Sequence, residues 1–210
     1  MPAPATRPVL IYGAGGFGRE IASWLGTDAA AAIHPVGFID DGEARAECAG
    51  LPVGSLAEMA RLHPGAGVLL ALGDGDSRRA AAERIKDAGL KAERFIYSSV
   101  LIGERVEIGE GSLVLPGSIL TCDIRIGAFV VVNCSCNIGH DVEIGSYSSL
   151  LGNNSLNGNV TIGEFVTIGS RATIHPGKRV GDNSTVGIGS VVIRSVRANV
   201  TVFGAPAKIL

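Results

Sequence analysis

His140 and Asp141 are the neighbouring residues in this sequence that are best suited to acid–base chemistry. A neutral imidazole is a competent general base near neutral pH, and a carboxylate can orient it or stabilise its charged form. Neighbours in sequence need not touch, so the sequence leaves contact between the two side chains open. Of the other histidines, His34 and His63 lie in predicted connecting segments. His175 takes the glycine place of its hexad, so we expect it to be a structural residue of a corner. His140 is therefore the candidate base.

A second chemical signal is the glycine-rich run Gly13-Ala14-Gly15-Gly16-Phe17-Gly18. It follows the apolar segment Val9–Tyr12 and precedes a stretch of helical character that reaches Leu25. A strand, a G-x-G-x-x-G turn and a helix in this order present backbone N–H groups to a phosphate. The alternative is a glycine turn that only lets the helix and the strand pack closely.

An acidic pair, Asp40 and Asp41, ends a second apolar segment, Val36–Ile39. A carboxylate at this place in an α/β unit could meet a ribose hydroxyl. Together with the glycine-rich run, the pair predicts nucleotide binding by Gly13, Gly15, Gly18, Asp40 and Asp41.

The element that must position His140 is a repeat with a period of six residues. Every sixth residue is aliphatic, from Ile102 through Ile108, Val114, Leu120, Ile126, Val132, Ile138, Ile144, Leu150, Leu156, Ile162, Ile168, Ile174, Val180 and Val186 to Val192. A fixed short period of this kind indicates a parallel β-helix, here left-handed, in which three hexads close one triangular coil and residues eighteen apart stack. All sixteen aliphatics should point inward, and the glycines that often follow them should permit the backbone conformations of a corner. His140 follows Gly139 at such a corner, where side chains point outward.

The repeat divides the chain into two predicted domains, an α/β domain over residues 1–97 and the β-helix over residues 98–210. In the first domain, Ser55 and Glu58 predict the start of a helix, Val68–Leu72 a third strand, and Ser77–Gly89 another helix. This domain is half of a dinucleotide-binding fold, so it suits a nucleotide-linked substrate better than NAD.

Composition excludes several classes of protein. The net charge is −2, charged residues make up 18 % of the chain, and there is no basic run, so nucleic acid is not an expected partner. No apolar stretch approaches a membrane span, and Met1–Pro8 lacks the apolar core of a signal peptide. The four cysteines show no paired framework, which favours a reducing cytoplasm, and the sequence predicts no metal site.

Several motifs in order resemble those of the bacterial nucleotide-sugar N-acetyltransferases, hexapeptide-repeat enzymes grouped with sialic acid O-acetyltransferase-like proteins. The motifs are Gly13-Ala14-Gly15-Gly16-Phe17-Gly18-Arg19-Glu20, Phe38-Ile39-Asp40-Asp41, Ile138-Gly139-His140-Asp141 and Gly204-Ala205-Pro206-Ala207-Lys208. The resemblance implies a homotrimer with active sites between neighbouring prisms and a nucleotide held by the N-terminal domain. It implies acetyl transfer from acetyl-CoA to the amine of a nucleotide-linked sugar, for example a 4-amino-4,6-dideoxy sugar, in bacterial glycan biosynthesis.

The same resemblance implies roles for individual residues. His140 would be the general base, Asp141 its acidic partner, and Gly158 the source of a backbone N–H that faces the acetyl carbonyl. Asn133 matches a residue near the sugar, while Ser170 and Ile188 match positions that line the coenzyme channel. For these last three, ordinary corner or rim structure is the alternative.

The chain departs from its relatives at two places. Phe17 stands where some relatives have a histidine in the glycine-rich loop, which changes the polar contacts of that loop with substrate. Ser149 stands where many have a second histidine near the acyl group; it could still donate a hydrogen bond to the coenzyme's acyl end.

Three other functions stay open. A histidine base would serve equally well in O-acetylation of sialic acid or another sugar. A prism metalloenzyme of the carbonic-anhydrase type needs three histidines on one metal, whereas the prism has only His140 and His175, which are out of register. The third is a catalytically inactive scaffold.

Overall fold

The computed structural model describes residues 6–42 and 46–210. It divides into two compact units, Met1–Ser98 and Ser99–Leu210. Most of the Met1–Pro8 segment, considered above for a signal peptide, lies outside the described residues. Among the helices of the described ranges, none is long and apolar enough to cross a bilayer.

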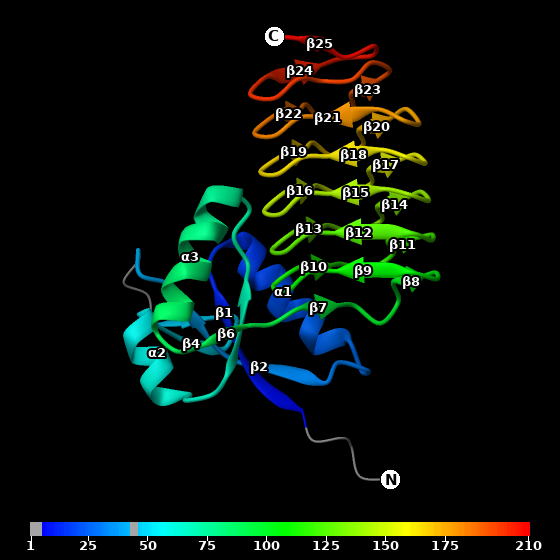
Figure 1. The fold of residues 1–210 in the computed structure, drawn as a ribbon. Coiled ribbons are helices and arrows are strands. Elements are labelled where there is room, and N and C mark those ends of the chain that lie inside the picture. The colour runs from blue at the N-terminus through cyan, green and yellow to red at the C-terminus, as the bar shows by residue number, and fades with distance from the viewer. Residues whose placement is uncertain (1–5, 43–45) are drawn as a thin grey trace. The chain divides into compact units, whose positions relative to one another are not determined.

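The first unit is an α/β fold built on a sheet in the order β3-β4-β2-β1-β5-β6 (Figure 1). Strands β4, β2, β1, β5 and β6 run parallel, and β3 is antiparallel to β4. The strands of this sheet are β1 (Arg7–Tyr12), β2 (Ile33–Ile39), β3 (Glu47–Cys48), β4 (Leu51–Gly54), β5 (Gly67–Leu70) and β6 (Lys91–Ala92). The short β7 (Phe95–Ile96) follows them in the chain and is not part of this sheet. The helices are α1 (Gly16–Thr27), α2 (Leu56–Leu62) and α3 (Gly75–Asp87). The predicted half-Rossmann-like fold is confirmed.

Side chains cap two of these helices. The Ser55 hydroxyl accepts a hydrogen bond from the N–H of Glu58 at 3.3 Å, so the predicted helix start at Ser55 is correct. Asp74 caps α3 by accepting from the N–H of Ser77 at 2.8 Å. α1 has Gly15 at its cap position and no side-chain cap, which leaves its first N–H groups open to a ligand.

The second unit is the predicted left-handed parallel β-helix, with three faces of stacked strands (Figure 1). The first face holds β10 (Leu113–Val114), β13 (Val131–Val132), β16 (Ser149–Leu150), β19 (Thr167–Ile168), β22 (Thr185–Val186) and β24 (Thr201–Phe203), with β25 (Lys208–Ile209) antiparallel to β24. The second holds β8 (Leu101–Ile102), β11 (Ile119–Leu120), β14 (Asn137–Ile138), β17 (Ser155–Leu156), β20 (Thr173–Ile174) and β23 (Val191–Val192). The third holds β9 (Val106–Ile108), β12 (Ile124–Ile126), β15 (Glu143–Ile144), β18 (Thr161–Ile162) and β21 (Arg179–Val180).

Residues eighteen apart stack as the period predicts. Ile119 pairs with Asn137, and Leu120 with Ile138, in parallel register. We call the turns that follow the first, second and third faces the first, second and third corners. A corner residue therefore has its counterparts directly beneath and above it on neighbouring coils, which fixes its place without help from distant side chains.

The core follows the repeat except at its first coil. Fourteen of the sixteen repeat aliphatics are buried, but Ile102 is 44 % exposed and Ile108 is partly exposed. The expectation that all sixteen are buried is therefore wrong for these two. They belong to the first coil of the unit, where only the following coil can cover them.

Polar side chains also lie inside the prism, and each is satisfied. Ser148 is buried; its hydroxyl donates to the carbonyl of Gly163 at 2.8 Å and accepts from the N–H of Val166 at 3.0 Å. Ser112 and Ser118 make the same pair of bonds to the coil that follows them. Bonding of both hydroxyl functions is what allows a polar group to be buried without a large penalty.

The glycines after the aliphatics serve a different purpose from the one predicted. Gly139 does not have a positive φ; a Cβ there would lie 2.8 Å from the backbone nitrogen of Gly158 on the next coil. The left-handed conformation falls two residues later, at Asp141, with φ +57°. These glycines therefore permit close stacking of coils, and the corner conformation is carried by other residues, often Asn or Asp, which tolerate it better than most.

Candidate active site

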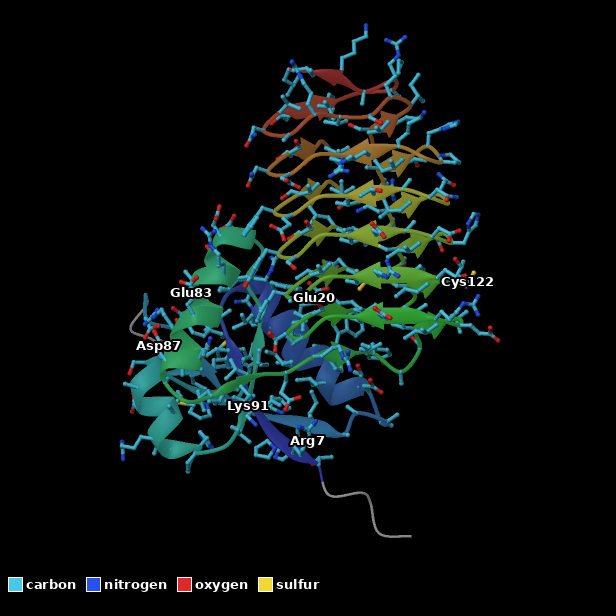
Figure 2. The ribbon with its side chains drawn as sticks, in the orientation of Figure 1. Arg7, Glu20, Glu83, Asp87, Lys91 and Cys122 are labelled. Atoms are coloured by element: carbon cyan, nitrogen blue, oxygen red, sulfur yellow. The ribbon has the colours of Figure 1, made fainter. Side chains whose placement is uncertain are left out.

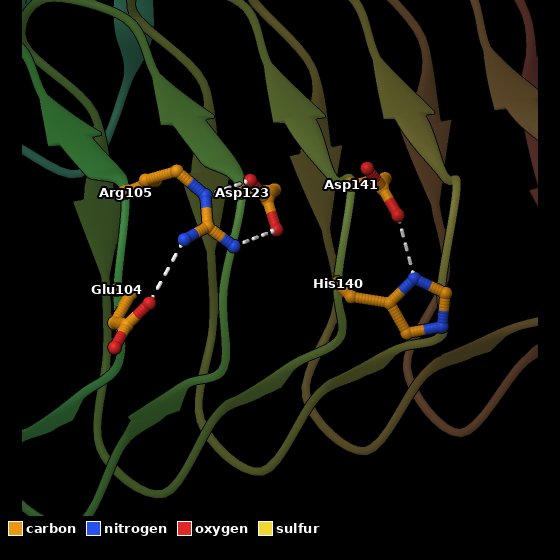
Figure 3. A network of polar contacts seen from close by, with 5 residues as sticks. All are labelled: Glu104, Arg105, Asp123, His140 and Asp141. Atoms are coloured by element: carbon orange, nitrogen blue, oxygen red, sulfur yellow. Dashed lines mark hydrogen bonds and ion pairs between the residues drawn. The ribbon is translucent and has the colours of Figure 1, made fainter.

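His140 and Asp141 form a hydrogen-bonded pair at the second corner, between β14 and β15 (Figure 3). Nδ1 of His140 lies 2.7 Å from Oδ2 of Asp141, and the two side chains are 59 % and 54 % exposed. The contact that the sequence left open is therefore made. It depends on the left-handed backbone at Asp141, which turns the carboxylate back toward the preceding side chain.

The pair defines which nitrogen of His140 is available for chemistry. A carboxylate only accepts hydrogen bonds, so Nδ1 carries the proton in this contact. In the neutral ring, Nε2 then has a free lone pair and can accept a proton. This is the arrangement that a general base requires.

Gly158 lies on the next coil, directly against the imidazole. A Cβ built on Gly158 would lie 2.5 Å from both Cε1 and Nε2 of His140, so only glycine leaves room for the ring. In the part of the chain that the structure describes, the N–H of Gly158 donates to no acceptor. A backbone donor beside the basic nitrogen is suited to stabilising an oxyanion.

A cavity of about 420 Å³ opens beside the pair. His140 is the one titratable side chain among the residues that line it; the others are apolar or neutral polar groups of the second face and the second corner: Ile119, Thr121, Asn137, Ile138, Gly139, Ser155, Leu156, Asn157, Gly158 and Pro176. The cavity therefore places one proton acceptor close to the unpartnered N–H of Gly158, in a site of otherwise neutral residues.

The three glycines of the G-x-G-x-x-G pattern differ in their surroundings. Gly13 has φ +103°, which L side chains rarely adopt. A Cβ on Gly18 would lie 1.9 Å from the carbonyl oxygen of Gly13, so Gly18 lets α1 pack on β1. Gly15, by contrast, has no atom within 4 Å of where its Cβ would be. Close packing thus explains Gly13 and Gly18, whereas Gly15 leaves open space at the start of α1.

Asp40 ties the end of β2 to this loop. Its Oδ2 accepts from the N–H of Ala14 at 3.0 Å, and its Oδ1 accepts from the N–H of Gly42 at 3.0 Å. The structure therefore places Asp40 directly at the predicted nucleotide-binding loop, as expected from the order of strands.

Asp41 takes part in a different network, with two residues that sequence reasoning missed. Its Oδ2 accepts from the Tyr12 hydroxyl at 2.8 Å and lies 2.9 Å from Nη1 of Arg84; its Oδ1 accepts from the N–H of Leu56. Burial of Tyr12, followed by its bond to Asp41, raises the pKa of the phenol to about 12. Burial alone would raise the pKa of Asp41, but the bonds from Leu56 and Tyr12 and the charge of Arg84 outweigh it and lower the pKa.

A third residue missed from the sequence supports the loop after β5. Arg78 is fully buried, and its Nη1 donates to the carbonyls of Leu72 at 2.8 Å and Gly73 at 3.0 Å. Burial lowers the pKa of Arg78 to about 10. In the sequence, Tyr12 only ends an apolar segment, and Arg78 and Arg84 only lie in a predicted helix. Neither feature indicates which residues they contact.

The remaining predicted residues lie away from His140 within the chain. Asn133, Ser170 and Ile188 are all at the first corner, whereas His140 is at the second. The side chain of Asn133 accepts from the N–H of Cys134 at 2.6 Å, and Ile188 is 64 % exposed. Ser149 is only 2 % exposed, on β16 of the first face. Within the described ranges, no three His, Cys, Asp or Glu side chains gather in a way that could hold a metal ion.

Comparisons with known proteins support the fold and show the family. The family defined as the PglD N-terminal domain matches residues 8–85. A histidine variant of perosamine N-acetyltransferase from Caulobacter crescentus, in complex with CoA and GDP-perosamine, is 28 % identical, with a TM-score of 0.90 over 97 % of this chain and 96 % of that one.

Two further structures match this chain over their entire length. WeeI from Acinetobacter baumannii AYE is 32 % identical, with a TM-score of 0.88 over 98 % of this chain and 100 % of that one. The acetyltransferase domain of PglB from Neisseria gonorrhoeae FA1090, in complex with acetyl coenzyme A, is 26 % identical, with a TM-score of 0.89 over 98 % and 100 %. With the half-Rossmann-like unit, the hexad-built prism and the His140–Asp141 corner all present, the chain belongs to the hexapeptide-repeat family of bacterial nucleotide-sugar N-acetyltransferases.

Proposed function

We propose that this enzyme transfers the acetyl group of acetyl-CoA to the amine of a nucleotide-linked amino sugar, with His140 as the general base. The observation that carries the proposal is the 2.7 Å contact between Nδ1 of His140 and Asp141, which leaves Nε2 available beside the N–H of Gly158. The relatives of known structure include enzymes bound to CoA and to GDP-perosamine, a nucleotide-linked amino sugar.

The reaction follows from these groups. The sugar amine attacks the thioester carbonyl, a C–N bond forms, and Nε2 of His140 takes a proton from the amine. The N–H of Gly158 donates to the carbonyl oxygen as negative charge develops on it. The C–S bond then breaks, and the imidazolium returns its proton to the departing thiolate, which gives CoA and the acetamido sugar. Asp141 stabilises the imidazolium and holds the ring; it does not itself carry the proton.

In this proposal the N-terminal unit, residues 1–97, binds the nucleotide portion of the substrate. The uncapped start of α1 and the space beside Gly15 suit a phosphate. Because Asp40 accepts from the N–H of Ala14 in the glycine-rich loop, we assign the ribose contact to Asp40 in particular. Asp40→Ala should raise the KM for nucleotide sugar about ten-fold, the scale of one lost hydrogen bond to a charged group, with little change in CoA affinity. Equal weakening of both ligands would remove Asp40 from this role.

We further propose a cytoplasmic homotrimer whose active sites lie between neighbouring prisms. His140, Asp141 and Gly158 are at the second corner and Asn133, Ser170 and Ile188 at the first, so a site that uses both sets needs corners from two chains. The second face, which separates these corners, exposes Leu101 at 62 % and Ile119 at 37 %, the kind of apolar surface that assembly covers. Light scattering should give the mass of three chains. None of the four cysteines forms a disulfide, and we propose a reducing compartment.

The proposal is tested by thiol release from acetyl-CoA against a panel of amino and hydroxy nucleotide sugars. We expect turnover with an amino sugar, and His140→Ala should lower kcat by about 10²–10⁴-fold. His175→Ala is the matched control, because His175 is exposed at the same corner and its ring, among the described residues, hydrogen-bonds only the carbonyl of Pro176. Turnover with hydroxyl acceptors alone would indicate O-acetylation, and full turnover of His140→Ala would overturn the assignment of the base.

A further inference from the structure

The second corner carries a column of charged residues beneath His140. Arg105, Asp123 and Asp141 are eighteen residues apart, so they stack on successive coils, about 4.8 Å apart. Each has a left-handed backbone, with φ of +55°, +55° and +57°. The shared conformation directs the three side chains to the same side of the corner, as Figure 3 shows.

Arg105 binds both oxygens of Asp123. Its Nε lies 2.5 Å from Oδ1 and its Nη2 lies 2.9 Å from Oδ2, while Nη1 reaches Glu104 at 2.8 Å (Figure 3). Hydrogen bonding from Arg105 lowers the pKa of Asp123, so this carboxylate stays ionised. The guanidinium thus neutralises the acidic residue that lies one coil below Asp141 and keeps it turned away from the imidazole.

We infer that Arg105 is a positioning residue for the acetyl transfer, because its two-point grip on Asp123 leaves Asp141 as the one carboxylate, among the described residues, that is hydrogen-bonded to His140. This inference rests on the proposed role of His140. Without Arg105, Asp123 would lie one coil from Asp141 as a second uncompensated negative charge. It would repel Asp141 and stabilise the imidazolium, so His140 would be protonated over a wider range of pH.

The other groups described around His140 do not take over the neutralisation of Asp123. On the coil below, bonding to Asp123 raises the pKa of the Cys122 thiol, which therefore adds no charge. On the coil above, Gly158 and Asn159 are neutral, and beyond them the same corner carries His175 and Lys178. On the third face, Arg125 and Glu143 pair with each other at 3.4 Å, and Glu107 lines the same hollow.

Arg105→Met and Asp123→Asn change the charge of the cluster Glu104, Arg105 and Asp123 in opposite directions, so we expect opposite shifts of the pH profile. The charge of this cluster is −1 in the natural protein, −2 in Arg105→Met, 0 in Asp123→Asn, and again −1 in the double variant. In Arg105→Met the extra negative charge favours the imidazolium, so the acid limb of the pH profile of kcat/KM should move to higher pH. In Asp123→Asn the limb should move to lower pH. In the double variant it should lie where it lies in the natural protein. A unit charge about 8 Å away in a water-like medium predicts a shift of about 0.3–0.5 of a pH unit. High salt should reduce each shift.

Arg179→Met is the matched control. Arg179 lies two coils above Glu143, as Arg105 lies two coils below Asp141, but on the third face and outside the column. Arg179→Met removes the same charge from outside the column, so it should move the acid limb less than Arg105→Met does. A purely structural role of Arg105 would lower the plateau and the melting temperature without moving the limb.

The midpoint of the His140 ring titration, followed by NMR on histidine-labelled full-length protein, gives a readout that does not depend on activity. Its resonance is assigned by its loss in His140→Gln. Opposite shifts in the two single variants and recovery in the double variant are the expected result. Unmoved midpoints, or a double variant that keeps the shift of Arg105→Met, would overturn the inference. If the midpoints shift but His140→Ala retains turnover, the proposed function fails and the electrostatic coupling stands.

Discussion

The two units position their functional side chains by different means. In the β-helix, His140, Asp141 and Gly158 are placed by the backbone register, since eighteen residues of chain return to the same corner one coil later. In the N-terminal unit, Asp40 and Asp41 are held by hydrogen bonds to Ala14, Tyr12, Leu56 and Arg84, which come from distant parts of the chain. A site in the first kind of unit can be located by counting residues, whereas one in the second requires knowledge of which side chains meet.

The largest effect that tests this difference is expected at Gly158, which is placed beside His140 by the backbone register of the coils. In Gly158→Ala, the new methyl would lie 2.5 Å from the ring of His140 and displace it. Because the substitution keeps the backbone N–H of residue 158 but moves the base, we expect kcat to fall by about 10²–10⁴-fold, the scale of losing general base catalysis, with little change in melting temperature because the corner is open to solvent. Steady-state kinetics and thermal unfolding measure the two effects.

Gly152→Ala is the control for that experiment. Gly152 has the same place in the preceding hexad, but a Cβ there would come no closer than 3.4 Å to the carbonyl oxygen of Cys134. We expect near-normal turnover. Similar loss in both variants would mean that a side chain at this place of the hexad lowers activity at either corner, and Gly158 would lose its special role.

A glycine in the other unit should show the opposite result. Gly18→Ala would place a methyl 1.9 Å from the carbonyl oxygen of Gly13, so α1 must move away from β1. Overpacking of this kind should lower the free energy of unfolding by about 1–3 kcal/mol. Gly16→Ala, at the first residue of α1 with nothing within 4 Å, should be neutral in urea denaturation. Equal stability of the two variants would contradict the packing role of Gly18.

The smallest effect concerns the side-chain network of the N-terminal unit. Because the pKa of Asp41 is lowered from 3.8 in the folded protein, its contribution to stability is present above that pH and is lost as pH falls through the folded value. Asp41→Asn should therefore cost about 1 kcal/mol at pH 7, a modest figure because the side chain is 29 % exposed. The difference from the natural protein should shrink at pH 3, as measured by urea denaturation at both values. A difference that persists at pH 3 would assign the loss to packing and not to charge.

The sequence predicts the β-helix well because its period is a property of the local backbone. The inward position of fourteen aliphatics and the stacking of residues eighteen apart both follow from counting. The exposure of Ile102 could not be predicted by counting, because the repeat is the same in every coil and does not distinguish the first coil from those inside the stack. The glycines were correctly placed but wrongly explained, since close approach between coils involves residues on two different turns.

The candidate site was predictable only in part. The sequence pointed to His140 and Asp141, but their contact depends on the left-handed backbone at Asp141, which no side-chain pattern reveals. Tyr12, Arg84 and Arg78 were missed because their partners lie elsewhere in the fold. The two-residue strands β3 and β6 were missed because such short segments carry no periodicity.

The serines inside the prism have a consequence for how the chain is made. The hydroxyls of Ser112, Ser118 and Ser148 bond carbonyl and N–H groups of the coil that follows them. Each finished coil thus offers donors and acceptors to the coil that leaves the ribosome next. Stacked repeats need only their neighbours to be stable, so the prism can assemble coil by coil in the direction of translation. A chain released early would end in a coil whose interior hydroxyls lack partners, and quality-control proteases would meet that open end first.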